Sequence, residues 1–177
     1  MTTAEYLMTP ETLQPRELIY GAMRLADSPF IPHQRVVGAF FKALDAHVRA
    51  HRLGEVILSP MDVVLDGPHA LVVQPDLLFV STARSHIVQD HVWGAPDLVV
   101  EVLSPHPRVG RLDERIAWFA RYGVTECWLV HQLDRRVEVL RFEDGDVAAR
   151  ASFSRWEPIS SSVLTGFSGT LDGIAGW

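Results

Sequence analysis

The spacing of apolar residues predicts two helices and an N-terminal hairpin. Residues 33–52 carry apolar side chains at helical spacing, so one face of this segment is hydrophobic. A second stripe of this kind runs through residues 111–122, and Gly123 stands where a helix C-cap is expected. Residues 17–26 predict a strand or a hairpin that bends at Gly21.

The middle of the chain is rich in β-branched residues separated by Pro and Gly, which predicts short strands. We expect strands at residues 54–59, 62–66, 70–81, 97–104, 126–131 and 136–142, with a surface excursion over residues 82–95. The run 97–104 is nearly all apolar, as is typical of a central strand covered on both faces. The ends are weakly patterned, so residues 1–16 predict a loose lead-in and residues 146–177 a peripheral tail of β structure and loops.

This order of elements predicts a mixed α/β (α+β) fold, with a sheet flanked by helices in a single domain over residues 1–177. No apolar run approaches the roughly 18 residues that a membrane span needs. The N-terminus lacks the basic start and apolar stretch of a signal peptide. The single cysteine, Cys127, is interpreted as a small buried hydrophobe. We therefore expect a cytoplasmic protein that does not enter membranes.

The formal net charge of −6 argues against strong non-specific binding of nucleic acid through a basic surface. It does not exclude an enzyme, because a metal site needs acidic residues and basic residues can be concentrated locally. The basic residues comprise fifteen arginines and one lysine, Lys42, which is expected on the surface of the first helix.

Two acidic residues stand in apolar surroundings. Asp76 follows Pro75 at the start of an apolar stretch, and Glu101 lies inside the run DLVVEVL. Burying a carboxylate costs free energy unless it is paired, protonated or bound to a metal. If the strand 97–104 lies beside the strand that holds Asp76, the two carboxylates can converge on one point.

Two converging carboxylates, completed by waters, suit Mg²⁺ or Mn²⁺. The alternative is that Asp76 merely begins a strand and Glu101 pairs with an arginine. Alternation along the strand also places Asp97 on the face of Glu101, where it is interpreted as an acid that supports the site or as a turn former.

The stretches QPDLLFV, APDLVVEVLSP and RYGVTECWLV, in this order, resemble the bacterial putative restriction endonuclease family of the PD-(D/E)XK nuclease superfamily. The resemblance covers roughly residues 15–142 and takes in REL…YG and the helix start at His33. The EVLSP-helix-GV-x-E-x-W arrangement is fairly specific, whereas Pro-Asp alone is weak. The resemblance implies a restriction-endonuclease-like fold, with Asp76 and Glu101 as metal ligands on successive strands. It also implies metal-assisted hydrolysis of DNA, with Glu17 as a further candidate ligand.

The sequence departs from this superfamily at the usual lysine, whose position two residues after the second acid is Leu103. In the resembling family a lysine often comes from the following helix, and that place holds Arg115. Arginine does not deprotonate in proteins, so it cannot act as a general base. Arg115 can instead stabilise phosphate charge while a metal activates water. The alternative is that Arg115 pairs with Glu101 or Asp76, or faces solvent.

Several nearby residues are weaker candidates. His33 begins a helix after Pro32, which favours a local structural role over lining the same cleft. Arg108 and Arg111 can join Arg115 in a phosphate-binding patch, or simply form a solvated helix surface.

Three hypotheses follow. The leading one is an Mg²⁺- or Mn²⁺-dependent endonuclease that cuts DNA as a homodimer, since two-fold dimers are the commonest oligomers. The second is a nucleic-acid-binding or regulatory module that has kept the fold and lost catalysis, as the missing lysine and the acidic composition suggest. The third is a protein–protein interaction domain, which no positive feature of the sequence favours.

Overall fold

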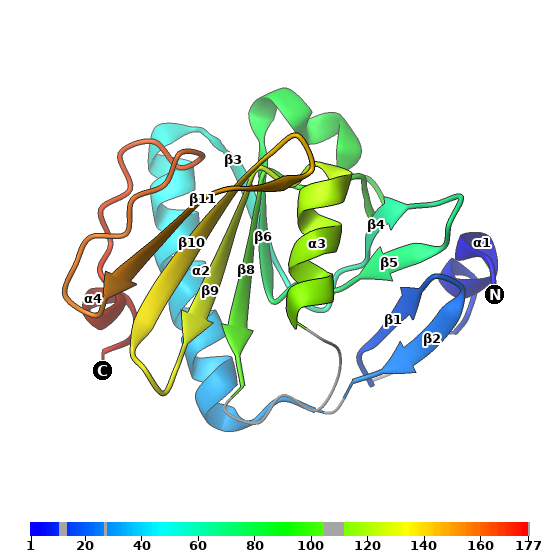
Figure 1. Cartoon of the computed structure of the whole chain (residues 1–177), viewed down its shortest axis with the longest axis horizontal. Helices are drawn as coiled ribbons and strands as arrows, with labels where there is room; N and C mark the ends of the chain where they lie inside the picture. The colour runs from blue at the N-terminus through cyan, green and yellow to red at the C-terminus, as the bar shows by residue number, and fades with distance from the viewer. Residues whose placement is uncertain (11–13, 27, 105–111, 177) are drawn as a thin grey trace.

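Two mixed β-sheets, with one long helix on each side of the larger sheet, form the framework of the protein (Figure 1). The computed structural model describes residues 1–10, 14–26, 28–104 and 112–176. Its elements, in chain order, are α1 (Thr3–Leu7), β1 (Arg16–Ile19), β2 (Ala22–Leu25), α2 (Ile31–His51), β3 (Gly54–Leu58), β4 (Val63–Asp66), β5 (Leu71–Val73), β6 (Leu77–Ser81), η1 (Thr82–Ile87), β7 (Val92–Trp93), β8 (Leu98–Leu103), α3 (Leu112–Tyr122), β9 (Glu126–His131), β10 (Arg136–Glu143), β11 (Asp146–Ser154) and α4 (Leu171–Ala175).

The larger sheet has six strands in the order β11-β10-β9-β8-β6-β3. The nearly continuous apolar run predicted a central strand, and β8 is one, because it pairs with β6 on one side and β9 on the other. The β8–β9 pair is parallel, and the other pairs in this sheet are antiparallel. The predicted mixed fold is confirmed.

The smaller sheet has five strands in the order β2-β1-β5-β4-β7, with β1 and β2 forming the predicted hairpin at Gly21. The single strand expected over residues 70–81 is wrong. That segment divides into β5 and β6, which belong to different sheets. Pro75 lies between them, and a proline has no N–H with which to continue a central ladder.

The segment 82–95 is more than a surface excursion. It holds the 3₁₀ helix η1 and the short strand β7, which pairs in parallel with β4. Ile87 and Val92 are buried in the core beside β4. These apolar side chains are too widely spaced to form a regular pattern, which is why the sequence did not predict their burial.

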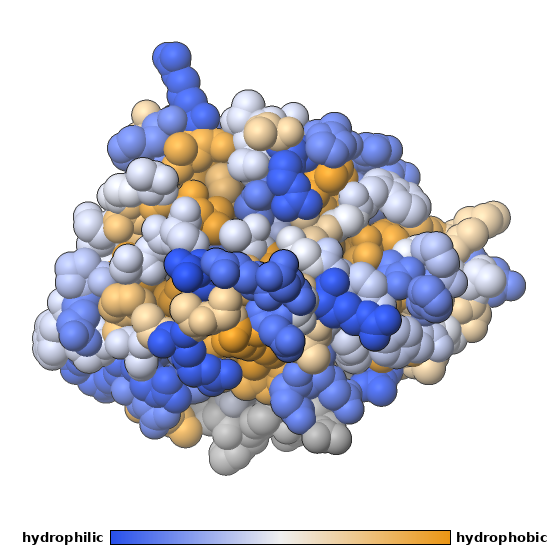
Figure 2. All heavy atoms as spheres, turned by 45° about the horizontal axis from the view of Figure 1, so that its top comes forward, coloured by the Kyte–Doolittle hydropathy of each residue, from blue (hydrophilic) through white to orange (hydrophobic). Residues whose placement is uncertain are grey.

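The helices α2 and α3 cover opposite faces of the six-stranded sheet (Figure 1). Val36, Phe40 and Leu44 of α2 are buried on one face, whereas Phe119 of α3 is buried on the other. Gly123 ends α3 with φ +94°, as its sequence position predicted. On the face shown in Figure 2, hydrophilic side chains are interleaved with smaller apolar areas. Within the described ranges, no helix has both the length and the apolar character to cross a membrane.

The ends of the chain pack more closely than their pattern predicted. In α1, Tyr6 is buried and its hydroxyl donates a hydrogen bond to the Arg16 carbonyl. The tail contributes β11 at the edge of the large sheet and α4 against α2. Ile159, Leu164 and Leu171 from this tail are fully buried in the core beneath α2.

A buried carboxylate anchors the tail. Glu126 is 1% exposed and accepts hydrogen bonds from the Trp128 Nε1, the Ser161 hydroxyl, and both the backbone N–H and the hydroxyl of Ser162. These four donors, at 2.6–2.8 Å, replace the water that the carboxylate loses on burial. The tail is therefore fixed by polar contacts as well as by its apolar side chains.

We expect Glu126→Gln to lower the free energy of unfolding by about 2–4 kcal/mol, because hydrogen bonds to a charged group are each worth about 1.5–3 kcal/mol. The amide NH₂ of glutamine would also face N–H and O–H groups that are themselves donors. Urea unfolding measures the change. Glu157→Gln, at an exposed acid in the same tail, is the control. Equal unfolding midpoints for the two variants would contradict an anchoring role.

Candidate active site

Asp76 and Glu101 face each other across two adjacent strands. In the antiparallel pair β6–β8, Leu77 is opposite Val100, so one further step of the register sets Asp76 opposite Glu101. Directly opposed residues project from the same face of a sheet, with Cβ atoms about 5 Å apart. The Val102 N–H donates a 2.8 Å hydrogen bond to Asp76 Oδ2, which holds the aspartate against β8. The predicted adjacency of these two strands is confirmed.

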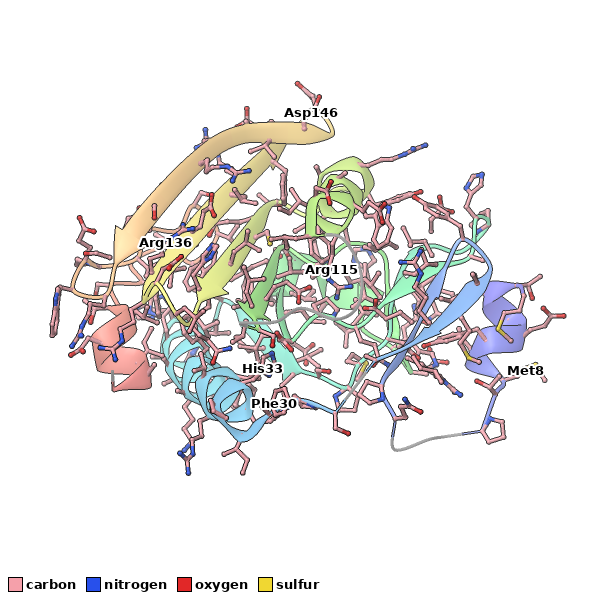
Figure 3. The ribbon with its side chains drawn as sticks, turned by 60° about the horizontal axis from the view of Figure 1, so that its bottom comes forward. Met8, Phe30, His33, Arg115, Arg136 and Asp146 are labelled. Carbon is pink, nitrogen blue, oxygen red and sulfur yellow. The ribbon has the colours of Figure 1, made fainter. Side chains whose placement is uncertain are left out.

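Arg115 of α3 reaches into the site and bridges two carboxylates. Its Nε lies 2.6 Å from Glu101 Oε1, and its Nη1 lies 2.7 Å from Glu17 Oε1. The three side chains are only 12–19% exposed. Of the two interpretations open for Arg115, pairing with Glu101 is therefore present in the structure, and Glu17 is an additional partner. The labelled Arg115 lies centrally in Figure 3.

The electrostatics of this group are dominated by an excess of acids. Burial raises the pKa of Glu101 to about 7, and the nearby charges of Asp76 and Glu17 add to that rise, whereas Arg115 opposes it. For Arg115, burial alone would lower the pKa, but Glu101 and Glu17 outweigh it, so the pKa rises and the guanidinium stays charged. Arg115 thus pairs with two of the three neighbouring carboxylates, Glu101 and Glu17, whereas Asp76 contacts His33.

Glu17 is held by more than its ion pair. Its Oε1 also accepts a 2.7 Å hydrogen bond from the backbone N–H of Gln74, so one oxygen is shared between Arg115 and the β5–β6 connection. No three His, Cys, Asp or Glu side chains in the described part of the chain are grouped to hold a metal ion. In this structure the Glu17 carboxylate contacts Arg115 and the Gln74 N–H, so the assignment of Asp76, Glu101 and Glu17 as metal ligands stays a prediction.

His33 contacts the site directly, although its place at a helix start favoured a local role. Its Nε2 lies 3.2 Å from Asp76 Oδ2, and its Nδ1 is buried with no hydrogen-bond partner among the described residues. Burial lowers the pKa of His33, but the hydrogen bond to Asp76 and the negative charges of Asp76 and Glu101 act together against burial, and the net shift is upward. Helix-start position alone gave no signal of this contact, because α2 meets β6 only in the folded chain.

The other candidates lie elsewhere. Asp97 accepts a hydrogen bond from the Ser81 N–H and pairs with Arg84, so it fixes the connection after β6 and does not support the acidic pair. Lys42 is exposed on α2, as predicted. Cys127 is fully buried, and burial raises the pKa of its thiol. Arg108 and Arg111 fall outside the described residues.

The fold is that of a nuclease-like mixed α/β protein. The chain matches the crystal structure of a putative nuclease belonging to DUF820 from Anabaena variabilis with a TM-score of 0.81. The two are 18% identical, and the match covers 100% of this chain and 98% of the other. Residues 3–172 match the Uma2 family, described as putative restriction endonucleases, and the chain belongs to that family. A comparison with curated proteins finds no match.

The raised pKa of Glu101 predicts a pH-dependent cost to folding. Its folded-state pKa lies above the ordinary value of 4.5, so ionisation is less favourable in the folded state, and its contribution to stability is lost as pH rises from about 4.5 to about 7. Glu101→Gln mimics the protonated side chain. In metal-free buffer we expect the free energy of unfolding of this variant to rise relative to that of the natural protein as pH increases across that window. The expected rise is on the order of 2–3 kcal/mol, since each pKa unit corresponds to about 1.4 kcal/mol.

Urea unfolding at about pH 5 and about pH 8 measures this gain. Glu143→Gln, at an acid whose side chain is 62% exposed, controls for the change in charge. A stability difference between Glu101→Gln and the natural protein that does not vary with pH would show that Glu101 ionises normally.

Proposed function

We propose that this chain is a divalent-metal-dependent endonuclease that hydrolyses phosphodiester bonds in DNA. The observation that carries the proposal is a largely buried Glu101, 12% exposed and with its pKa raised to about 7, opposite Asp76 on the neighbouring strand. Two acids held together with too little positive charge form a site that a cation stabilises. Membership of a family described as putative restriction endonucleases supports this assignment.

The donor chemistry of the site fits Mg²⁺ or Mn²⁺. Mg²⁺ is commonly bound through one or two carboxylates together with waters and substrate phosphates, so Asp76 and Glu101 are sufficient protein ligands. Bound there, a metal ion supplies a water of lowered pKa and polarises the phosphoryl oxygen. Asp76 is already oriented by the Val102 N–H and by His33, which fixes one of its oxygens.

Arg115 supplies the fixed positive charge. A guanidinium forms paired hydrogen bonds with a phosphate and remains protonated, so its role is to stabilise charge that develops on the phosphate. Glu17 holds Nη1 of the guanidinium while Glu101 holds Nε, so the side chain cannot swing away freely. The proton of the attacking water passes to solvent or to a base other than Arg115.

A second candidate is a nucleic-acid-binding module without catalysis. It is favoured by one observation, that Arg115 already pairs with Glu101, so substrate and metal must compete with an existing ion pair. Binding of DNA without cleavage would support this candidate.

For the endonuclease we also propose a homodimer, whose two sites would cut both strands of a duplex. The mass of the protein in solution tests this oligomeric state.

We expect Mn²⁺-dependent cleavage of plasmid or single-stranded DNA that falls by about 100-fold or more in Asp76→Asn, because transition-state charge loses its main stabilisation. Gel analysis over time measures the rate. Glu143→Gln, purified identically, reports contaminating nuclease. Cleavage that persists unchanged in Asp76→Asn, or that needs no divalent ion, would exclude the proposed site.

Arg115→Lys separates charge from geometry. Lysine keeps the positive charge but loses the planar fork, so we expect a cleavage rate lowered by about tenfold and not abolished. Arg115→Ala leaves two buried carboxylates without their cation, which costs about 3–5 kcal/mol and can prevent folding. Thermal unfolding therefore accompanies each assay. A folded Arg115→Ala variant with full activity would remove Arg115 from the mechanism.

A further inference from the structure

A second group of charged side chains lies on the same sheet, away from the acidic pair. We name it the Glu138 cluster and define it as Glu138, Arg136, Arg150 and His131. Its residues come from β9, β10 and β11. The Glu138 carboxylate is only 10% exposed, whereas Arg136 is 34% and Arg150 55% exposed. The carboxylate is thus buried beneath its cations, and solvent meets the guanidinium groups.

Glu138 binds three basic side chains at once. Arg150 Nη1 donates to Glu138 Oε1 at 2.6 Å, while His131 Nε2 lies 3.2 Å and Arg136 Nη1 3.5 Å from Oε2. Arg136 Nη2 also lies 3.3 Å from His131 Nδ1, so the contacts fit a neutral imidazole that carries its hydrogen on Nε2. These contacts hold Glu138 ionised, and the Arg150 hydrogen bond lowers its pKa against the effect of burial.

The cluster carries more positive than negative charge. Two guanidinium groups share one buried carboxylate, and each guanidinium has five N–H donors, more than Glu138 can accept. Asp134 lies 3.6 Å from Arg136, but its side chain is 64% exposed and such surface pairs contribute little. An oxyanion that approaches from solvent therefore meets oriented donors whose positions the buried carboxylate has already fixed.

The register of the sheet aligns this cluster with the candidate active site. Glu101 is opposite Leu129 on β9, and Leu129 is opposite Glu138 on β10. Residues in one such row share a face of the sheet, and strands are spaced by about 4.8 Å, so Glu138 lies roughly 10 Å across the sheet from Glu101. Figure 3 labels Arg115 and Arg136 in the view that brings the carboxyl ends of β8 and β9 forward.

We propose that Arg136 and Arg150 bind a backbone phosphate of a nucleic-acid strand that flanks the phosphate held at Asp76 and Glu101. This inference rests on the proposed function, because it assumes that the bound strand crosses the sheet. Guanidinium groups match phosphate in geometry and charge. In a chain with net charge −6, a strand needs local cationic positions of this kind to overcome general repulsion. Contacts to phosphate set the position of the strand and carry no sequence preference.

The salt dependence of DNA binding tests the proposal. Fluorescence anisotropy with a labelled single-stranded oligonucleotide, in EDTA so that no cleavage occurs, gives the affinity over a range of salt concentrations. We expect the double variant Arg136→Gln/Arg150→Gln to bind about tenfold more weakly and to lower the slope of log affinity against log salt by roughly 0.7, the value for one phosphate contact on a single strand. Glutamine retains a donor for Glu138, which protects the fold.

Arg141→Gln is the matched control. Arg141 lies on the same strand, is 46% exposed and pairs with Glu143, but it is opposite Glu126, so it projects from the other face of the sheet. Its substitution removes the same kind of charge and is expected to leave the salt slope unchanged. Thermal unfolding of all variants separates a loss of binding from a loss of folding.

Each outcome decides a different statement. If the natural protein binds DNA and the double variant keeps its affinity and salt slope, the phosphate position is overturned while the proposed nuclease stands. An equal loss of DNA affinity and salt slope in the double variant and in Arg141→Gln also overturns the phosphate position, since only the total charge of the protein would then matter. Binding with the expected loss of slope, but without Mn²⁺-dependent cleavage, supports the phosphate position and overturns the nuclease. Absence of both binding and cleavage in the natural protein overturns both.

Discussion

The burial of Glu101 near the middle of the six-stranded sheet is the constraint on which the site depends. A carboxylate in the interior is costly unless it is paired, and the cost after relaxation is still several kcal/mol. Arg115 provides the pairing from α3, and it reaches Glu101 only if the first residues of that helix lie over β8. Glu17 adds a second anchor from the smaller sheet. One guanidinium therefore ties together a helix and two sheets.

The same ion pair leaves the site electrostatically unbalanced. Asp76, Glu101 and Glu17 outnumber Arg115, and the surplus is visible in the raised pKa of Glu101. A protein selected only for stability would replace such a group with apolar side chains, which often pack as well or better. Retention of three acids around one cation is instead characteristic of sites that bind charged ligands, where local instability accompanies function.

The sequence predicted those features whose signal is local. The alternation in residues 97–104 assigned the face of Glu101, and the apolar stripe before Gly123 located α3. Features that depend on contacts between distant segments were not predictable in this way. Pro75 divides one apolar segment between two sheets. The apolar patterns of β5 and β6 do not indicate which sheet each strand joins. The contact of His33 with Asp76 likewise exists only because α2 begins beside the start of β6.

The Glu17–Arg115 pair joins residues 98 positions apart in the chain, and this separation has a consequence for the order of folding. Contacts between distant residues must overcome the entropy of closing a long loop before they give any stability. During synthesis from the N-terminus, the β1–β2 hairpin emerges long before α3 exists. Glu17 and Glu101 must therefore stay hydrated until Arg115 is available to pair with them. We expect the candidate site to be among the last parts of the molecule to become ordered, after both sheets have formed their cores.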